Sequence, residues 1–335
     1  MPELRGRQKP AKPRKENSVQ DLHNHLAAFF NCNNNCVHCM ERDPSGKGLE
    51  LAAARLKKDF SLSQLKALLE KKALIAGAPV VFTGGEPTLN PGLPAMAGLL
   101  RRSGFRDIAL QTNGRMLCYK DFCLQLIKAG IGRFGISIHG SSAKTHEAIT
   151  RTRGSFRQTI AGIENLLELK KTLPRLTITT HTTPTRLNIS DLEPMLALFS
   201  GWKVNTIVIN PLCFKGNAVK YSRQLFLPYC AIARELKKAI AGIRRRRTIH
   251  LPRISITDFP LCVTAGLTEH AGVFERVALL SPDAKASLLD QKLGFAGAKR
   301  KQCRACRHFN ACTGISPFYI KEFGWEEFVP CTESV

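Results

Sequence analysis

Three cysteines near one end of the sequence have the spacing of a metal site. Cys32, Cys36 and Cys39 form a Cys-x3-Cys-x2-Cys run. A four-iron cluster takes four ligands, so three thiolates leave one iron open for a molecule that is not protein. The same thiols could instead belong to a zinc knuckle. The run therefore predicts a metal site without choosing the metal.

A second motif, Gly84-Gly85-Glu86-Pro87, favours the iron–sulfur interpretation. Together the two motifs resemble the radical S-adenosylmethionine (radical SAM) superfamily, and zinc becomes the minor alternative at this site. The resemblance extends from about His23 to Pro330. It implies that the open iron chelates the amino and carboxylate groups of SAM, and that the reduced cluster cleaves SAM to a 5'-deoxyadenosyl radical.

The resemblance also implies which residues hold SAM. Gly84 and Gly85 let the backbone approach the ligand, and Pro87 fixes the turn. Glu86 takes a hydrogen bond from the SAM ammonium. The imidazole of His38 stands in for an aromatic ring that lies near the adenine in relatives.

Polar residues at other strand ends resemble family residues that contact the SAM ribose or the substrate. They are Asn113, Ser137 and Asn188. Each could equally be an ordinary buried, capping or turn residue.

A second group of cysteines follows much later in the chain. Cys303-x2-Cys306-x5-Cys312, with Cys262 upstream, resembles the Twitch module, a shortened SPASM domain that carries one auxiliary four-iron cluster in radical SAM enzymes. Four thiolates close a coordination sphere, so these four are the expected ligands. Cys331 could replace Cys262, and structural zinc is the alternative occupant.

The elements that must position these residues alternate between short apolar runs and helical patterns. Six such units predict an α/β fold with a parallel sheet that curves into a partial (βα)6 barrel. Both motifs then fall at the carboxyl ends of strands, on one face of the barrel. The expected strands are Leu22–Phe30, Pro79–Thr83, Asp107–Thr112, Arg133–Ile138, Leu176–His181 and Thr206–Asn210.

Three serines mark expected helix starts. Ser61, Ser155 and Ser190 are each followed three residues later by Gln or Glu, the pattern of a capping box. Apolar residues recur at helical spacing after Ser155, which predicts a helix there.

The sequence predicts three parts. Residues 1–20 form a basic, disordered tail, residues 21–242 the barrel, and residues 243–335 a small Cys-rich iron–sulfur module. The last part has loops, scattered Pro and Gly, and the second cysteine group.

The composition indicates a cytoplasmic protein that keeps its thiols reduced. None of the apolar runs approaches the roughly eighteen residues of a membrane span, and the basic start has no apolar signal-peptide core. No membrane partner is therefore expected. Twelve cysteines without a secretion signal favour metal binding over disulfides.

The chain is strongly basic, with a formal net charge of +24. Basic residues gather in the first fifteen positions, at Arg244–Arg247, and between Lys299 and Arg307. Such a field attracts polyanions, including RNA, although a solvated basic surface explains it equally well.

The expected function is therefore a radical SAM enzyme, of oxidoreductase or transferase type, that abstracts hydrogen from a peptide or protein side chain. An electron donor such as flavodoxin or ferredoxin is the expected partner. An RNA-modifying radical enzyme and a non-catalytic metal-binding protein are the alternatives. A molybdenum-cofactor-type cyclase is disfavoured because those relatives end in Gly-Gly, whereas this sequence ends Thr332-Glu333-Ser334-Val335.

Overall fold

The computed structural model describes residues 22–29, 31–40, 60–246, 251–264, 266–270, 276–280, 286–289, 297–310, 312 and 314–332. The predicted tail at residues 1–20 lies outside these residues, as does Arg247 in the basic run. Among the described residues no helix has the length and apolar character needed to cross a bilayer.

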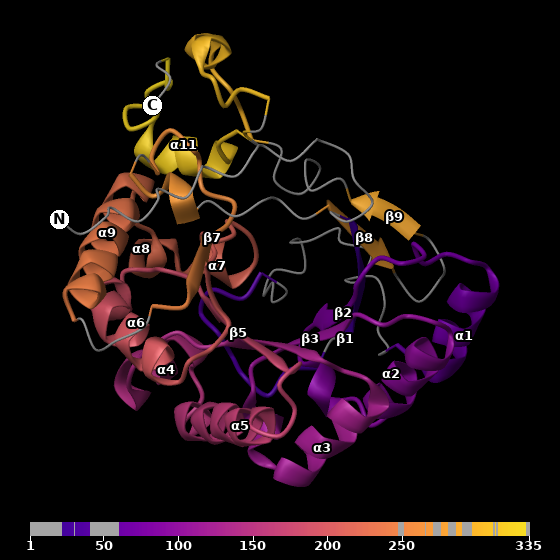
Figure 1. Ribbon diagram of the computed structural model, residues 1–335. Coiled ribbons are helices and arrows are strands. Elements are labelled where there is room, and N and C mark those ends of the chain that lie inside the picture. The colour runs from indigo at the N-terminus through magenta and orange to yellow at the C-terminus, as the bar shows by residue number, and fades with distance from the viewer. Residues whose placement is uncertain are drawn as a thin grey trace, which may run out of the picture.

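One curved sheet forms the centre of the molecule (Figure 1). The six predicted strands are present, in the order of the chain, and each pairs in parallel with the next. The prediction of a parallel α/β barrel that is open on one side is therefore confirmed. The six strands are β1 (Leu22–Phe29), β2 (Val80–Gly84), β3 (Ile108–Thr112), β4 (Arg133–Ser137), β5 (Thr177–Thr182) and β6 (Thr206–Ile209).

Three further strands extend this sheet at both edges. β7 (Arg253–Ile256) pairs in parallel with β6. β8 (Arg276–Leu280) pairs in parallel with β1 and antiparallel with β9 (Ala286–Leu289). These strands were not expected from the sequence, which was read beyond residue 242 as a separate, loop-rich module. A domain boundary at residue 242 stays a prediction, and these strands beyond it continue the barrel sheet.

Helices cover the outer side of the curved sheet (Figure 1). The helix expected after Ser155 is present, and its residues Ile163 and Leu166 are fully buried. The helices are α1 (Leu62–Glu70), α2 (Leu93–Arg102), α3 (Lys120–Ala129), α4 (Ala143–Thr150), α5 (Ser155–Lys170), α6 (Leu192–Gly201), α7 (Asn217–Lys220), α8 (Ser222–Leu225), α9 (Tyr229–Arg245) and α11 (Pro317–Phe323).

One of the three predicted capping boxes is confirmed. Ser61 caps α1, and its side chain and that of Gln64 make the reciprocal pair of hydrogen bonds. The other two predictions are wrong. Ser155 is already inside α5, where its hydroxyl lies 2.8 Å from that of Thr150, and Ser190 lies in a short 3₁₀ turn before α6.

The two faces of the sheet differ in polarity. Phe134, Ile136 and Ile178 are buried toward the helices, where each contributes about 1.5–3 kcal/mol of hydrophobic stabilisation. Several of the alternate side chains, among them Thr83, Gln111 and His181, are polar and face the other side of the sheet. Thr83 donates to Gln111 at 2.9 Å, and His181 lies 3.4 Å from Asn210. The interior is thus lined with groups that can bind a polar ligand.

The C-terminal segment packs on the β7 edge of the barrel, beside α9 (Figure 1). Tyr319 of α11 is fully buried and stacks on Tyr229 of α9 with ring centroids 4.5 Å apart. Its hydroxyl accepts a hydrogen bond from the Tyr229 backbone at 2.8 Å and donates to Glu327. This contact fixes the second cysteine group relative to the barrel.

Candidate active site

The first cysteine group lies in the loop that follows β1. Cys32, Cys36 and Cys39 are all partly exposed there. The backbone of this loop is tied to the end of α4: Asn35 N–H donates to the Thr150 carbonyl and Val37 N–H to the Ile149 carbonyl, both at 2.9 Å. The loop therefore has a fixed course on the barrel.

Asn217, the first residue of α7, holds the other end of the same loop. Its backbone N–H donates to the Cys39 carbonyl at 3.0 Å, and its side-chain amide donates to the Cys36 carbonyl at 2.9 Å. Asn217 is almost completely buried. The start of α7 thus fixes the backbone at two of the three cysteines.

Arg115 fastens the middle of the cysteine loop. Its guanidinium donates to the Asn33 carbonyl, to the Asn34 side chain at 3.1 Å and to Gln158 at 2.7 Å. Because a guanidinium holds several acceptors in a fixed plane, Arg115 sets the position of the loop relative to α5.

The predicted glycine-rich motif forms the turn at the end of β2. Gly84 adopts φ +119°, a backbone conformation that side chains other than glycine rarely take. The Glu86 N–H then donates to the Asn31 carbonyl at 2.7 Å, which joins this turn to the cysteine loop. The two motifs that are distant in sequence are thus adjacent.

The Glu86 carboxylate is buried and accepts hydrogen bonds from other groups of the protein, and only 1% of the residue is exposed. Its Oε1 accepts from the Thr88 backbone at 3.1 Å, the Thr88 hydroxyl at 2.5 Å and the Thr112 hydroxyl at 2.6 Å. Its Oε2 accepts from the Asn113 N–H at 2.7 Å. Burial raises the pKa of this carboxyl, and the hydrogen bonds from Thr112, Thr88 and Asn113 act in the opposite direction.

Asn113 follows β3 and contacts the cysteine loop directly. Its side-chain amide donates to Asn33 Oδ1 at 2.7 Å and lies 3.9 Å from Cys32 Sγ. Its Oδ1 accepts from the Arg115 N–H at 3.0 Å. The structure thus places Asn113 beside the metal motif.

Three histidines form a row that begins in the cysteine loop: His38 is partly exposed, whereas His139 and His146 are buried. His38 packs edge-on against His139 at 4.5 Å, and His139 stacks on His146 at 6.0 Å. Burial lowers the pKa of His38 and of His146 to about 4. These rings are neutral at ordinary pH, so His38 presents an uncharged, planar side chain, and its place beside the adenine stays a prediction.

The remaining predicted contact residues differ in their surroundings. Ser137 ends β4 and is partly exposed. Asn188 is completely buried: it accepts from the Thr185 N–H at 2.7 Å and donates to the carbonyls of His139 and Thr183, both at 3.1 Å. Its side chain is therefore used in holding the β4 and β5 loops together.

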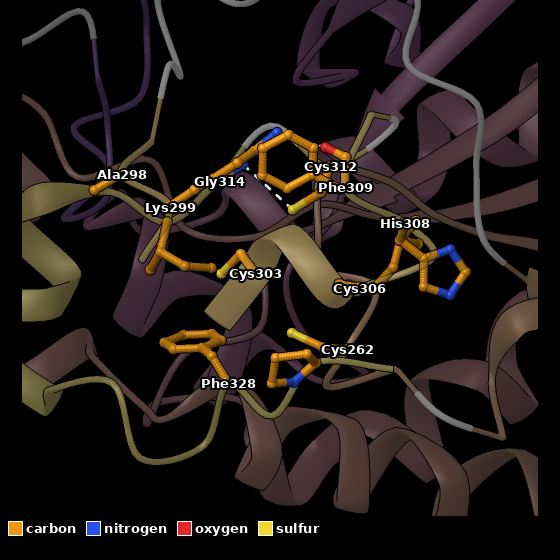
Figure 2. Close-up of a pocket in the computed structure, with 13 residues that line it drawn as sticks. Cys262, Ala298, Lys299, Cys303, Cys306, His308, Phe309, Cys312, Gly314 and Phe328 are labelled. Atoms are coloured by element: carbon orange, nitrogen blue, oxygen red, sulfur yellow. Dashed lines mark hydrogen bonds between the residues drawn. The ribbon is translucent and has the colours of Figure 1, made fainter. Parts of the chain in front are cut away.

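The second cysteine group surrounds one cavity in the C-terminal segment. Figure 2 shows Cys262, Cys303, Cys306 and Cys312 around it, with Phe328 below. Cys312 Sγ accepts a hydrogen bond from the Gly314 N–H at 3.3 Å. The four thiols predicted as ligands, from segments far apart in sequence, thus face the same space.

Cys331, the predicted substitute for Cys262, lies close to this group. Its thiol is hydrogen-bonded with that of Cys306, and its carbonyl accepts from the Arg307 N–H at 2.9 Å. Burial, together with the nearby thiols of Cys312, Cys331 and Cys306, raises the pKa of Cys262 to about 12. Five thiols are therefore gathered where a four-iron cluster would need four.

The donor chemistry of both sites suits iron–sulfur clusters. The first site offers three partly exposed thiols beside N–H donors, and the second offers thiols around a cavity. In the described part of the chain, no group of three or more His, Cys, Asp or Glu side chains is arranged to hold a single metal ion.

Several residues that shape the site were missed from the sequence. Arg115, Thr112, Thr88 and Asn217 bind the two motifs to each other and to the barrel. Their only signal was a place at or near the end of a predicted strand or turn, which does not distinguish them from ordinary loop residues.

Known proteins with similar sequences and folds belong to the family that the two motifs resemble. The family model for the radical SAM superfamily matches residues 28–199, which include both motifs. Among solved structures, Streptococcus suis SuiB bound to the precursor peptide SuiA matches with a TM-score of 0.63 and 11% identity, over 93% of this chain and 75% of that one. The enzyme anSMEcpe with bound AdoMet matches with a TM-score of 0.62 and 15% identity, over 92% and 95%.

Curated relatives match a smaller part of the chain. The Fe-coproporphyrin III synthase of Methanosarcina barkeri is 25% identical over 56% of this chain and 43% of its own length. The AdoMet-dependent heme synthase of the same organism is 33% identical over 40% and 36%. A probable GTP 3',8-cyclase of Saccharolobus islandicus is 29% identical over 41% of each. This chain thus spans about two fifths of the length of these relatives.

Because the family model covers just over half of the sequence and includes the site, this chain belongs to the radical SAM superfamily of enzymes, which use a [4Fe–4S] cluster and SAM.

Proposed function

We propose that this enzyme abstracts a hydrogen atom from a side chain of a peptide or protein. The observation that carries the proposal is the fold match over more than nine tenths of the chain to two proteins solved with peptides. Those structures hold SuiA and the Cp18Cys peptide, respectively. The polar lining of the barrel interior is consistent with such a substrate.

In this proposal Cys32, Cys36 and Cys39 bind a [4Fe–4S] cluster, and SAM occupies its open iron. The bound pair supplies the 5'-deoxyadenosyl radical that removes hydrogen from the substrate. Gly84 and Gly85 bring backbone groups close to SAM. Pro87 fixes that turn, and it is almost completely buried.

The other contact residues divide into two groups. We assign ligand contact to Ser137 and His38, because Ser137 is partly exposed at a strand end and His38 is neutral and planar. Glu86 retains one lone pair on Oε2 for the SAM ammonium, since that oxygen has one protein donor. Asn188 acts by positioning the loops on which these contacts depend.

We assign the C-terminal thiols Cys262, Cys303, Cys306 and Cys312 to an auxiliary [4Fe–4S] cluster, with Cys331 as the possible replacement for Cys262. The supporting observation is their arrangement around one cavity. Zinc bound by the same thiols is the competing assignment, and iron, sulfide and zinc analysis of the anaerobically reconstituted protein separates the two.

The segment that carries Cys303 and Cys306 supports an acidic electron donor as partner. Between residues 297 and 310 it contains five basic residues and no acidic one. Lys299, Lys301 and Arg304 are exposed, and Lys299 lies over the ring of Phe309 at the cavity. A small acidic carrier such as flavodoxin or ferredoxin complements this charge.

RNA and small molecules are the competing substrates. The basic surface favours RNA, and the curated relatives are synthases of porphyrins and a probable cyclase of GTP. A fractionated cell extract tests all three: reduced enzyme and SAM are mixed with extract, and the stimulation of 5'-deoxyadenosine formation is measured. We expect protease to remove the stimulation. Loss with ribonuclease instead would favour RNA, and a stimulant that passes dialysis and survives both treatments would favour a small molecule.

A further inference from the structure

Asn113 has surroundings that its predicted role in binding ribose or substrate does not require. Its backbone is fixed on both sides: the N–H donates to Glu86 at 2.7 Å, and the carbonyl accepts from the Thr159 hydroxyl at 2.8 Å. Gly114, the next residue, has φ +77°, and a Cβ there would lie 2.8 Å from Ile136. The position of Asn113 is therefore set by β3, β4 and α5 together.

The orientation of the Asn113 amide follows from its partners. Its Oδ1 accepts from the Arg115 N–H, a group that can only donate. The NH₂ group must then point the other way, toward Asn33 Oδ1 at 2.7 Å and Cys32 Sγ at 3.9 Å. One amide hydrogen serves Asn33 and the second is directed at the thiol, so the side chain is fully used by the cysteine loop.

Cys32 already has a donor from its own loop, because the Asn34 N–H lies 3.4 Å from Cys32 Sγ. Asn113 adds a second donor that comes from a different strand end. Hydrogen bonds to ligating sulfurs stabilise negative charge and help to set the reduction potential of an iron–sulfur cluster.

We infer that Asn113 is a positioning residue that donates a hydrogen bond to the Cys32 thiolate and raises the reduction potential of the cluster held there. The inference rests on the proposed cluster at Cys32, Cys36 and Cys39. The reduced cluster carries one more negative charge than the oxidised one, so an N–H donor favours the reduced state. Removing the donor makes the cluster harder to reduce.

The test compares Asn113→Ala with Asn165→Ala in the full-length, reconstituted protein. Asn165 is a matched control, since it is partly buried nearby and its amide donates to the carbonyls of Leu117 and Cys118, outside the cysteine loop. The midpoint potential is measured by an EPR-monitored redox titration, in which the first cluster is recognised by the change of its signal on adding SAM.

We expect Asn113→Ala to shift this potential to more negative values, by up to about tenfold in the equilibrium constant for one-electron reduction, or about 59 mV. Asn165→Ala should leave it unchanged. An Asn113→Ala protein with a complete cluster and the wild-type potential would overturn the inference.

Asn113→Ser provides a second variant if the alanine variant does not retain the cluster, because its hydroxyl can still accept from the Arg115 N–H. Loss of the cluster from both variants would also overturn the inference, since the contact would then be structural. If the wild-type protein itself forms no SAM-responsive cluster, the proposed function fails, and that outcome is distinct from an unshifted potential.

Discussion

Glu86 Oε2 accepts a 2.7 Å hydrogen bond from the backbone N–H of Asn113, which joins the turn after β2 to the turn after β3. The same carboxylate also binds the hydroxyls of Thr88 and Thr112. Glu86 is therefore the point at which the glycine-rich motif, the third strand and the cysteine loop are connected, and it contributes to the architecture of the site as well as to any ligand.

Replacement of Glu86 by alanine should lower the stability of the fold. The variant leaves the two threonine hydroxyls and the Asn113 N–H buried without their acceptor, and we expect the free energy of unfolding to fall by about 3 kcal/mol. Urea denaturation measures it. The control is Glu193→Ala, which removes an exposed ion pair with Arg246 and should cost less than about 1 kcal/mol. Equal effects of the two variants would contradict the assigned role of Glu86.

The histidine row should make the fold sensitive to acid. Burial lowers the pKa of His146 from 6.5 to about 4, so the unfolded chain binds this proton more readily than the folded one. The stability that the fold gains from holding the His146 ring neutral is complete above pH 6.5 and is lost as the pH falls toward 4. His146→Gln keeps an oxygen that can accept from the His139 N–H, which donates to the ring at 3.2 Å. Urea denaturation at several pH values gives the free energy of unfolding as a function of pH. Between pH 4 and 6.5 its slope should correspond to about one proton fewer in His146→Gln than in the wild type. The same slope in both proteins would contradict this prediction.

The gathering of five thiols predicts redundancy at the second site. Cys262→Ala and Cys331→Ala should each leave four thiols and retain the auxiliary cluster, whereas the double variant leaves three and should lose it. Iron and sulfide analysis checks the result, with Cys230→Ala, an exposed thiol outside the cavity, as the control. Loss of the cluster from one single variant alone would instead identify that cysteine as the required ligand.

Polyanion binding should depend steeply on salt. We expect the affinity for unrelated RNA sequences to fall by orders of magnitude between low and physiological salt, because bound counterions are released. Replacing Lys301 and Arg304 by Glu should weaken binding more than the same change at Lys171 and Arg175, which are exposed on another part of the surface. Tight binding of one defined RNA at physiological salt would favour an RNA substrate.

The sequence was sufficient to predict the six central strands and the two cysteine groups, because alternation of apolar runs and cysteine spacing are local patterns. It was not sufficient for the connections between them. Arg115 reaches Asn34 across 81 residues of sequence and Thr112 reaches Glu86 across 26, and such contacts exist only once the strands are paired. Ser155 shows the opposite limit: its local pattern predicted a cap, but the helix is capped by Gly154 and the Ser155 hydroxyl lies 2.8 Å from that of Thr150.

The most direct test of the account is cleavage of SAM by the reduced protein. Anaerobically reconstituted wild-type protein, reduced with dithionite and mixed with SAM, should slowly release 5'-deoxyadenosine and methionine without any substrate, as measured by chromatography and mass spectrometry. Single replacement of Cys32, Cys36 or Cys39 by alanine should abolish this release, whereas Cys303→Ala with Cys306→Ala should spare most of it. Absence of 5'-deoxyadenosine from the fully reconstituted wild-type protein, with or without cell extract, would contradict the catalytic account and favour a non-catalytic metal-binding protein.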